Sequence, residues 1–197
     1  MAQGLVPADN MKPFAEKIYK EANRMITLIA DIIQLSQLDE GKTQFVREKV
    51  DVGMLLEEVV QRLQPLAEQN EVTLSVYVEP SSVTGVRQVL QEIFYNLCEN
   101  AIKYNKPGGM VKVSVIQVGN QAVVKVADTG IGIPAEEQPR VFERFYRVDK
   151  SHSRIIGGTG LGLSIVKHGV QLHQGDISLE SQPDKGTAIT VRLPITL

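Results

Sequence analysis

The stretch Asp128-Thr-Gly-Ile-Gly-Ile-Pro134 directly follows an alternating apolar run, Ala122-Val-Val-Lys-Val-Ala127. The alternation predicts a half-buried strand, so Asp128 is expected where a strand runs into a loop. Gly130 and Gly132 let the backbone turn with positive φ and let a flat ligand approach without a Cβ in the way. Taken alone, such a stretch is more often a surface turn closed by an aspartate hydrogen bond, so other motifs must decide.

Further motifs flank this stretch: Asn96-Leu-Cys-Glu-Asn100-Ala-Ile-Lys103-Tyr104 upstream, and Phe142-Glu-Arg-Phe145-Tyr-Arg147 and Gly157-Gly-Thr-Gly160-Leu-Gly162-Leu-Ser-Ile-Val-Lys167 downstream. In this order the motifs resemble the N, G1, F and G2 boxes of the sensor histidine kinases. Their ATP-binding domain belongs to a wider family with DNA gyrase B, Hsp90 and MutL. The resemblance covers roughly residues 50–197. It implies an α/β fold of the Bergerat type.

The order of apolar patterns predicts a two-layer α/β sandwich. The resemblance implies that its sheet is mixed and that three main helices lie on one face. One long amphipathic helix, 13–38, precedes it; its wide apolar face requires partner helices, and Gly41 is its expected C-cap. We expect helices at 52–69, 86–104 and 161–172, a short helix at 136–142, strands at 44–50, 72–78, 111–118, 121–127, 176–181 and 187–193, and loops at 80–85 and 146–158.

Composition limits the class of protein. A net charge of −2 with scattered basic residues provides no field for nucleic acid. Cys98 is the only cysteine among the 197 residues, which excludes a disulfide framework and indicates a reducing, cytoplasmic compartment. Its apolar neighbours predict a buried core thiol. No apolar run is long enough for a membrane span, and residues 1–10 do not form a signal peptide.

Polar residues on helix 86–104 predict a phosphate and metal site. Asn96, Asn100 and Lys103 share one helical face. An amide oxygen is a neutral hard ligand suited to Mg²⁺, and we assign the metal contact to Asn100. The resemblance implies that Lys103 and Tyr104 reach phosphate or ribose. In ATP-hydrolysing relatives a glutamate occupies the position of Asn96, and since an amide cannot act as a base, phosphoryl transfer to a side chain is favoured over hydrolysis.

The resemblance also implies an adenine pocket. Asp128 would accept a hydrogen bond from the adenine amino group, and Thr187 would complete the pocket. Gly158, Gly160 and Gly162 leave backbone amides free for phosphates at the start of a helix; this run is neither a P-loop nor a dinucleotide motif. The remaining expected nucleotide contacts are Gly130, Gly132, Ile133, Tyr146, Thr159, Leu161 and Leu163.

The loop 146–158 is too long for an ordinary connection, which predicts a functional lid that is disordered without nucleotide. Phe142 and Phe145 are expected to anchor one edge of this lid. Arg147 is placed to meet the γ-phosphate and to stabilise the transferring charge. A solvated lid arginine is an equally good interpretation of Arg147.

The resemblance also implies an acceptor histidine that this chain lacks. His152, His168 and His173 do not have the His-Glu/Asp-x-x-Thr/Asn-Pro context of the family. We therefore expect residues 1–42 to be the connecting turn and second helix of a dimerisation hairpin, and residues 43–197 the catalytic domain. The intact parent would form a homodimer, phosphorylate its own histidine from ATP·Mg²⁺ and pass the phosphoryl group to a response-regulator aspartate. Any membrane attachment would come from parts of the parent protein that this chain does not contain.

Two alternative functions remain open. A serine kinase of the anti-sigma-factor type shares the fold but has no dimerisation hairpin. The helix 13–38 and the Phe142-Glu-Arg-Phe-Tyr-Arg147 motif argue against this alternative. A non-catalytic scaffold that only senses ATP is the other alternative, because lone helices make good docking surfaces.

Overall fold

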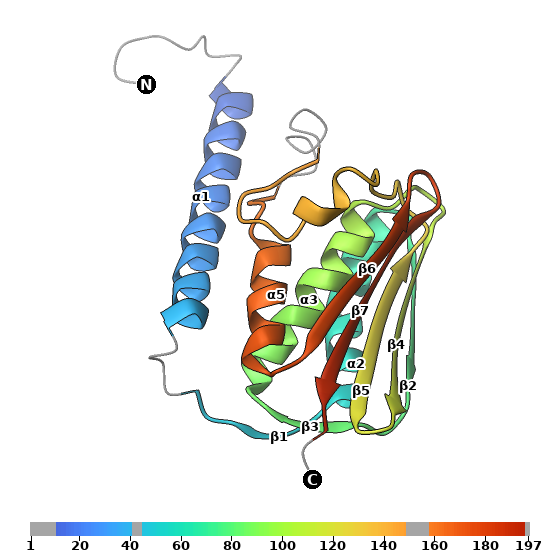
Figure 1. The fold of residues 1–197 in the computed structure, drawn as a ribbon. Coiled ribbons are helices and arrows are strands. Elements are labelled where there is room, and N and C mark those ends of the chain that lie inside the picture. Colours follow the sequence, from blue (N-terminus) through green and yellow to red (C-terminus); the bar gives the residue numbers. More distant parts are fainter. Residues whose placement is uncertain (1–10, 41–44, 149–157, 196–197) are drawn as a thin grey trace.

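The computed structural model describes residues 11–40, 45–148 and 158–195 (Figure 1). The helices are α1 (Met11–Glu40), α2 (Val52–Gln69), α3 (Arg87–Lys103) and α5 (Gly162–Leu172). The strands are β1 (Glu48–Asp51), β2 (Thr73–Val78), β3 (Ser82–Gly85), β4 (Met110–Val118), β5 (Gln121–Asp128), β6 (Asp176–Gln182) and β7 (Gly186–Pro194). Gly41 and residues 149–157 of the expected lid lie outside the described residues.

The main sheet has five strands in the order β2-β4-β5-β7-β6, and α2, α3 and α5 cover one of its faces (Figure 1). The pair β2–β4 is parallel and the other pairs are antiparallel, so the sheet is mixed. Val124 lies in register with Val115 on β4 and with Val191 on β7, which lines up buried valines across the sheet. These features confirm the predicted two-layer α/β sandwich, which one long helix precedes in the sequence.

The core lies between the helices and the sheet. Phe94, Leu97 and Cys98 of α3 are buried there with the inward valines of β4 and β5. Burial raises the pKa of the Cys98 thiol to about 12. The thiol is therefore protonated and shielded, which confirms the prediction of a core cysteine.

A small second sheet corrects the prediction of a loop at 80–85. β3 pairs antiparallel with β1, and Val83 and Val50 face each other as buried partners. Both strands are only four residues long. Such a pair is too short to show periodicity, and its partners lie far apart in the sequence, so local patterns do not reveal it.

Residues 136–142 also differ from the prediction of a short helix. Only Gln138–Arg140 forms a single 3₁₀ turn, and the flanking residues form turns. The Glu137, Gln138 and Arg140 amides bond three or four residues back, which satisfies the backbone without a longer helix.

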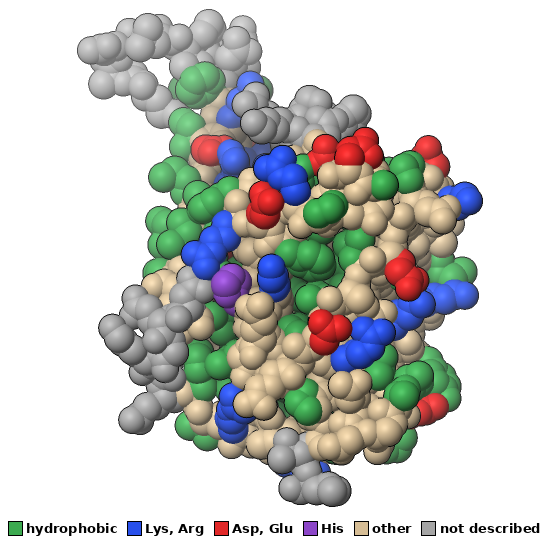
Figure 2. All heavy atoms as spheres, viewed as in Figure 1, with side chains coloured by type: hydrophobic (Ala, Val, Ile, Leu, Met, Phe, Trp, Pro, Cys, Tyr) green, Lys and Arg blue, Asp and Glu red, His purple; other side chains and the backbone are tan. Residues whose placement is uncertain are grey.

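Helix α1 stands beside α5 (Figure 1) and presents most of its apolar face to solvent. Leu35 is buried in a small cluster with Leu161 and Ile165, and Leu28 and Leu38 are partly buried against that cluster. Figure 2 shows hydrophobic side chains along the outer edge of α1; the exposed ones are Met11, Phe14, Ile18, Tyr19, Met25, Ile26, Ile29, Ile32 and Ile33. Within the described ranges, no helix is long and apolar enough to cross a membrane.

His173, at the end of α5, fixes the start of α3. Val86 is the N-cap residue of α3, and its side chain makes no capping hydrogen bond. Its backbone N–H instead donates to His173 Nε2 at 2.9 Å. Since Nε2 must accept this bond, Nδ1 carries the proton and donates to the Gly169 carbonyl at 2.7 Å. The buried imidazole is therefore neutral, and it links α5 to the helix that carries Asn96 and Asn100.

This bond predicts a loss of stability in acid. Burial lowers the pKa of His173, so its contribution is complete above the unfolded value of about 6.5 and is lost as pH falls towards the folded value. His173→Ala should cost about 1–3 kcal/mol at pH 8 because the Val86 N–H loses its acceptor. Urea unfolding at pH 8 and pH 5.5 measures both effects. The variant should lose less stability on acidification than the parent; equal losses would contradict this role. His168→Ala is the control.

Candidate functional site

A cavity of about 870 Å³ opens between α3, the loop after β5, the start of α5 and one side of α1. Every predicted site residue lines it except Gly130 and Leu161. Leu161 is instead buried against Leu35 and Ile165, and Gly130 contributes its N–H to a hydrogen bond with Asp128. The structure therefore brings residues from four separate motifs into one site.

Asp128 ends β5 and places its carboxylate at one end of this cavity. Its Oδ1 accepts hydrogen bonds from the Gly130 N–H at 2.8 Å and the Thr187 N–H at 3.2 Å. Burial raises the pKa of Asp128, and these two bonds act in the opposite direction. In the described part of the chain, both bonds to this carboxylate go to Oδ1, so Oδ2 can accept a donor from a ligand. The aspartate turn and the predicted binding role are thus compatible.

The loop after Asp128 is held against the turn between β6 and β7. Gly132 has a φ of +68°, and a Cβ at this position would overlap the Gln182 carbonyl. The Ile131 carbonyl accepts from the Asp184 N–H at 2.8 Å. A side chain at Gly132 would therefore push apart the two segments that close this end of the cavity.

Sequence reasoning missed two residues that position this pocket. Ser181 Oγ accepts from the Ile133 N–H at 2.8 Å and lies 2.8 Å from Thr187 Oγ1. Gln138 Nε2 donates to the Ile133 and Ser181 carbonyls, both at 2.9 Å. The Ser181–Ile133 and Gln138–Ser181 contacts join segments that are more than 40 residues apart, so no local pattern in the sequence reveals them.

Helix α3 forms a polar wall. Asn96, Asn100 and Lys103 line the cavity from one face of the helix, as predicted. Lys103 forms an ion pair with Glu99 at 2.9 Å, and Asn96 Nδ2 donates to the Glu92 carbonyl at 3.0 Å. A Cβ at Gly162 would lie 2.7 Å from Asn96 Oδ1, so a side chain there would displace the Asn96 amide from its present position.

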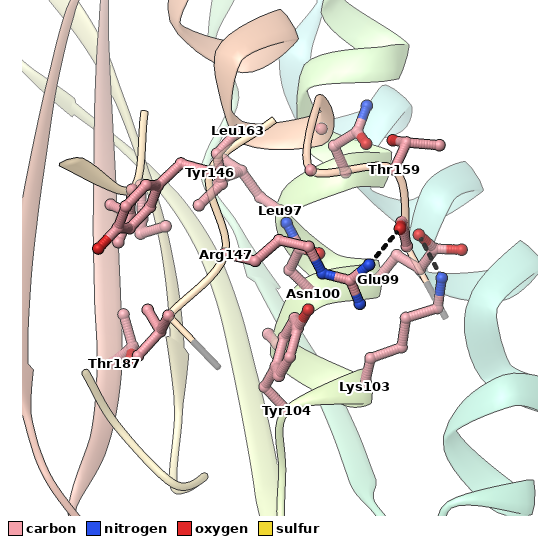
Figure 3. Close-up of a pocket in the computed structure, with 18 of the residues that line it drawn as sticks. Leu97, Glu99, Asn100, Lys103, Tyr104, Tyr146, Arg147, Thr159, Leu163 and Thr187 are labelled. Carbon is pink, nitrogen blue, oxygen red and sulfur yellow. Dashed lines mark hydrogen bonds and ion pairs between the residues drawn. The ribbon is translucent and has the colours of Figure 1, made fainter. Parts of the chain in front are cut away.

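The edge of the lid joins the glycine segment 158–162. Arg147 Nη1 donates to the Gly158 carbonyl at 2.9 Å, and its guanidinium lies near Asn100 and Tyr104 (Figure 3). The Phe145 N–H donates to the Gly160 carbonyl at 2.9 Å. Phe145 as a residue is 58% exposed, so its side chain contributes little to this connection. The backbone of Phe145 makes the connection instead.

Helix α1 contributes a wall that the sequence did not predict. Thr159 Oγ1 donates to Asp31 Oδ2 at 2.6 Å. The α1 residues that line the cavity are Lys20, Glu21, Arg24, Thr27 and Asp31.

The cavity has two chemical ends. Near Asp128 its walls include Val126, Ile131 and Ile189, an apolar slot suited to a flat heterocycle. On the other side lie the α3 amides, Lys103, Arg147 and the glycine segment, which suit phosphates. Residues 11–40, 45–148 and 158–195 contain no cluster of three or more His, Cys, Asp or Glu side chains that could hold a metal.

Comparison with known proteins agrees with this geometry. Residues 85–197 match the model of the family "Histidine kinase-, DNA gyrase B-, and HSP90-like ATPase". The chain is 38% identical over 187 residues to the sensor-like histidine kinase SenX3 of Mycolicibacterium smegmatis, covering 94% of this chain and 49% of that protein. The chain thus spans about half the length of this relative.

Solved structures give the same result. The mycobacterial sensor histidine kinase MprB superposes with a TM-score of 0.67 at 34% identity, over 76% of this chain and 97% of that chain. The Acinetobacter baumannii histidine kinase AdeS, at 20% identity, shares the fold with a TM-score of 0.80 over 100% of this chain and 90% of that chain. These matches confirm the resemblance drawn from the sequence motifs. The chain belongs to the histidine kinase-, DNA gyrase B- and HSP90-like ATPase family.

Proposed function

We propose that this chain is the ATP-binding catalytic part of a sensor histidine kinase. It binds ATP·Mg²⁺ and transfers the γ-phosphoryl group to a histidine on a dimerisation hairpin, from which the group passes to a response-regulator aspartate. The observation that carries the proposal is Asp128, whose carboxylate closes an apolar slot opposite a wall of amides. An adenine amino group donates where the carboxylate accepts.

The donor set at the phosphate end fits Mg²⁺. Asn100 offers one neutral oxygen, and phosphates and water would supply the other ligands, as this ion prefers. Bound there, the ion would neutralise phosphate charge. Lys103 and Arg147 would orient the triphosphate, with Lys103 leaving its partner Glu99 to do so. Asn100 is therefore the proposed metal contact.

Asn96 favours transfer over hydrolysis. Its amide has no basic site and lies against Gly162, so it cannot activate water. In the proposed reaction a histidine nitrogen forms a bond to the γ-phosphorus, the bond from that phosphorus to the β,γ-bridging oxygen breaks, and ADP leaves. The acceptor imidazole is its own nucleophile, so the site needs to provide alignment and charge stabilisation rather than a strong base.

The position and surface of α1 support its assignment to a dimerisation hairpin. We propose that residues 1–42 contain the connecting turn and second hairpin helix, and that residues 43–197 are the catalytic domain. The long row of exposed apolar side chains on α1 suits packing between copies in a parent homodimer. The buried, protonated Cys98 is compatible with a cytoplasmic location, with any membrane attachment outside this chain.

Asp128→Asn should weaken adenine nucleotide binding. A hydrogen bond to a charged group contributes about 1.5–3 kcal/mol, so the dissociation constant should rise about 10- to 150-fold. Titration of a fluorescent ATP analogue with and without Mg²⁺ measures this change. Asp176→Asn is the matched control, because Asp176 also lies at a strand end but is 74% exposed on its side chain. If Asp128→Asn and Asp176→Asn bound the ATP analogue with equal affinity, the adenine would not lie at Asp128.

Transfer of radiolabel from ATP should distinguish the kinase from the alternatives. With a supplied hairpin peptide that contains an acceptor histidine, label should appear on the peptide, stable in alkali and lost in acid. The chain itself should retain none. Asn100→Ala should reduce the transfer by at least about 10- to 100-fold, because the loss of an outer-shell partner of a metal ligand already has an effect of this size.

The other outcomes are equally informative. Acid-stable phosphoserine on a partner would support the anti-sigma-type kinase. Nucleotide binding without any transfer to the peptide would support the scaffold. Phosphohistidine on the chain itself would show that one of its own histidines accepts the group.

A further inference from the structure

A hydrogen bond connects α1 to the predicted phosphate segment. Thr159, between Gly158 and Gly160, donates its hydroxyl proton to Asp31 Oδ2 at 2.6 Å. The same hydroxyl oxygen accepts the Leu161 N–H at 3.3 Å, at the start of α5. Asp31 thus engages the segment whose amides are suited to phosphate, and both residues line the same cavity.

The surroundings of Asp31 are acidic. Asp31 is half-buried, and this burial raises its pKa more than the bond from Thr159 lowers it. Glu99 also raises the pKa of Asp31, while Lys103 lowers it. Asp31 in turn contributes to the raised pKa of Glu92. Lys103 is already paired with Glu99 at 2.9 Å, which leaves Asp31 and Glu92 as neighbouring carboxylates. Arg147 and Lys20 are further cations that line the cavity, and Arg147 binds the Gly158 carbonyl.

The other charges that α1 brings to the cavity act less strongly. Arg24 and Glu21 form a pair with each other at 3.1 Å, and their side chains are 51% and 63% exposed. Lys20, the remaining charged α1 residue that lines the cavity, is exposed as well. Opposite charges in solvent largely cancel and are screened. Asp31 is the α1 charge that is both partly buried and bonded to the glycine segment.

We propose that Asp31 is a specificity-determining residue that opposes polyphosphates: while α1 is docked, its carboxylate disfavours ATP more than ADP, and leaves adenosine unaffected. The inference rests on the proposed nucleotide site and deepens it. A carboxylate beside the phosphate segment repels each added phosphate charge, and this repulsion is stronger where water is partly excluded. Asp31 also accepts the hydroxyl proton of Thr159, so this hydroxyl does not donate to a phosphate while the bond is formed. Docking of α1 and triphosphate binding therefore oppose each other, and this coupling is reciprocal.

The test compares Asp31→Asn with the parent chain. The asparagine keeps an oxygen that can accept from Thr159 but removes the charge. Glu16→Gln is the matched control, since it removes the same charge from an exposed position on α1 outside the cavity. Each protein is titrated with ATP, ADP and adenosine in the presence of Mg²⁺. Asp31→Asn should bind ATP at least about 5-fold more tightly, the lower range of coupling between sites. The affinity for ADP should rise less, and the affinity for adenosine should not change. Glu16→Gln should leave all three affinities unchanged.

The three ligands separate the possible failures. Suppose that adenosine binds the parent chain. If Asp31→Asn then changes all three affinities equally, changes none of them, or lowers the affinity for ATP, the proposed role of Asp31 is wrong. The adenine site stands in each of these cases. If adenosine binds neither protein, the proposed nucleotide site itself fails, and the inference fails with it.

A distance measurement tests the reciprocal effect. Spin labels at Lys17→Cys on α1 and Lys167→Cys on α5 occupy exposed positions, and the buried Cys98 thiol does not compete for label. ATP·Mg²⁺ should lengthen the distance between the labels, whereas adenosine should not. The lengthening should be smaller in Asp31→Asn. An unchanged distance at saturating ATP·Mg²⁺ would show that α1 docking and triphosphate binding are compatible.

Discussion

One oxygen of Asp128 holds together two segments that are distant in the sequence. Its Oδ1 receives the N–H of Gly130 from its own loop and the N–H of Thr187 from β7. Thr187 and Asp128 come together only when β5 and β7 pair in their observed register. The ligand site is thus a product of the folded sheet rather than of one loop. Because Oδ1 is committed to the fold, Oδ2 is the oxygen that can select a ligand.

This arrangement gives a physical reason for preferring adenine. A carboxylate accepts hydrogen bonds, and adenine presents an amino group where guanine presents a carbonyl oxygen. A guanine in the same orientation would place two acceptors against each other in a partly buried site. The phosphate end is built differently, from neutral amides, a paired lysine and backbone N–H groups. In the proposed function, recognition of the base and handling of the phosphates would therefore be separate tasks of β5 and α3.

The sequence predicted the parts of this site that depend on local patterns. The strand before Asp128, the helical face of Asn96 and Asn100, and the glycine segment all follow from spacing and residue type within single stretches. The sequence predicts that Gly132 lets a flat ligand approach because it has no Cβ. The structure adds that a side chain there would overlap the Gln182 carbonyl.

What sequence reasoning missed depends on contacts between distant segments. Neither the β1–β3 pair nor the Ser181 contacts leave a periodic signal. The bond from Thr159 to Asp31 joins residues 128 positions apart, and α1 otherwise reads as an ordinary amphipathic helix. The link from His173 to the start of α3 likewise needs the packed structure, because a lone histidine near a helix end has no distinctive pattern.

The most direct test of the central claim is an NMR titration that follows the backbone amides of Gly130 and Thr187. Both amides donate to Asp128 Oδ1, so a ligand that binds the same carboxylate must change their surroundings. The account predicts that both resonances shift on addition of ADP·Mg²⁺ and stay in place with GDP·Mg²⁺. Equal shifts with both nucleotides, or shifts confined to other parts of the chain, would contradict the assignment of Asp128 as the adenine-recognising group.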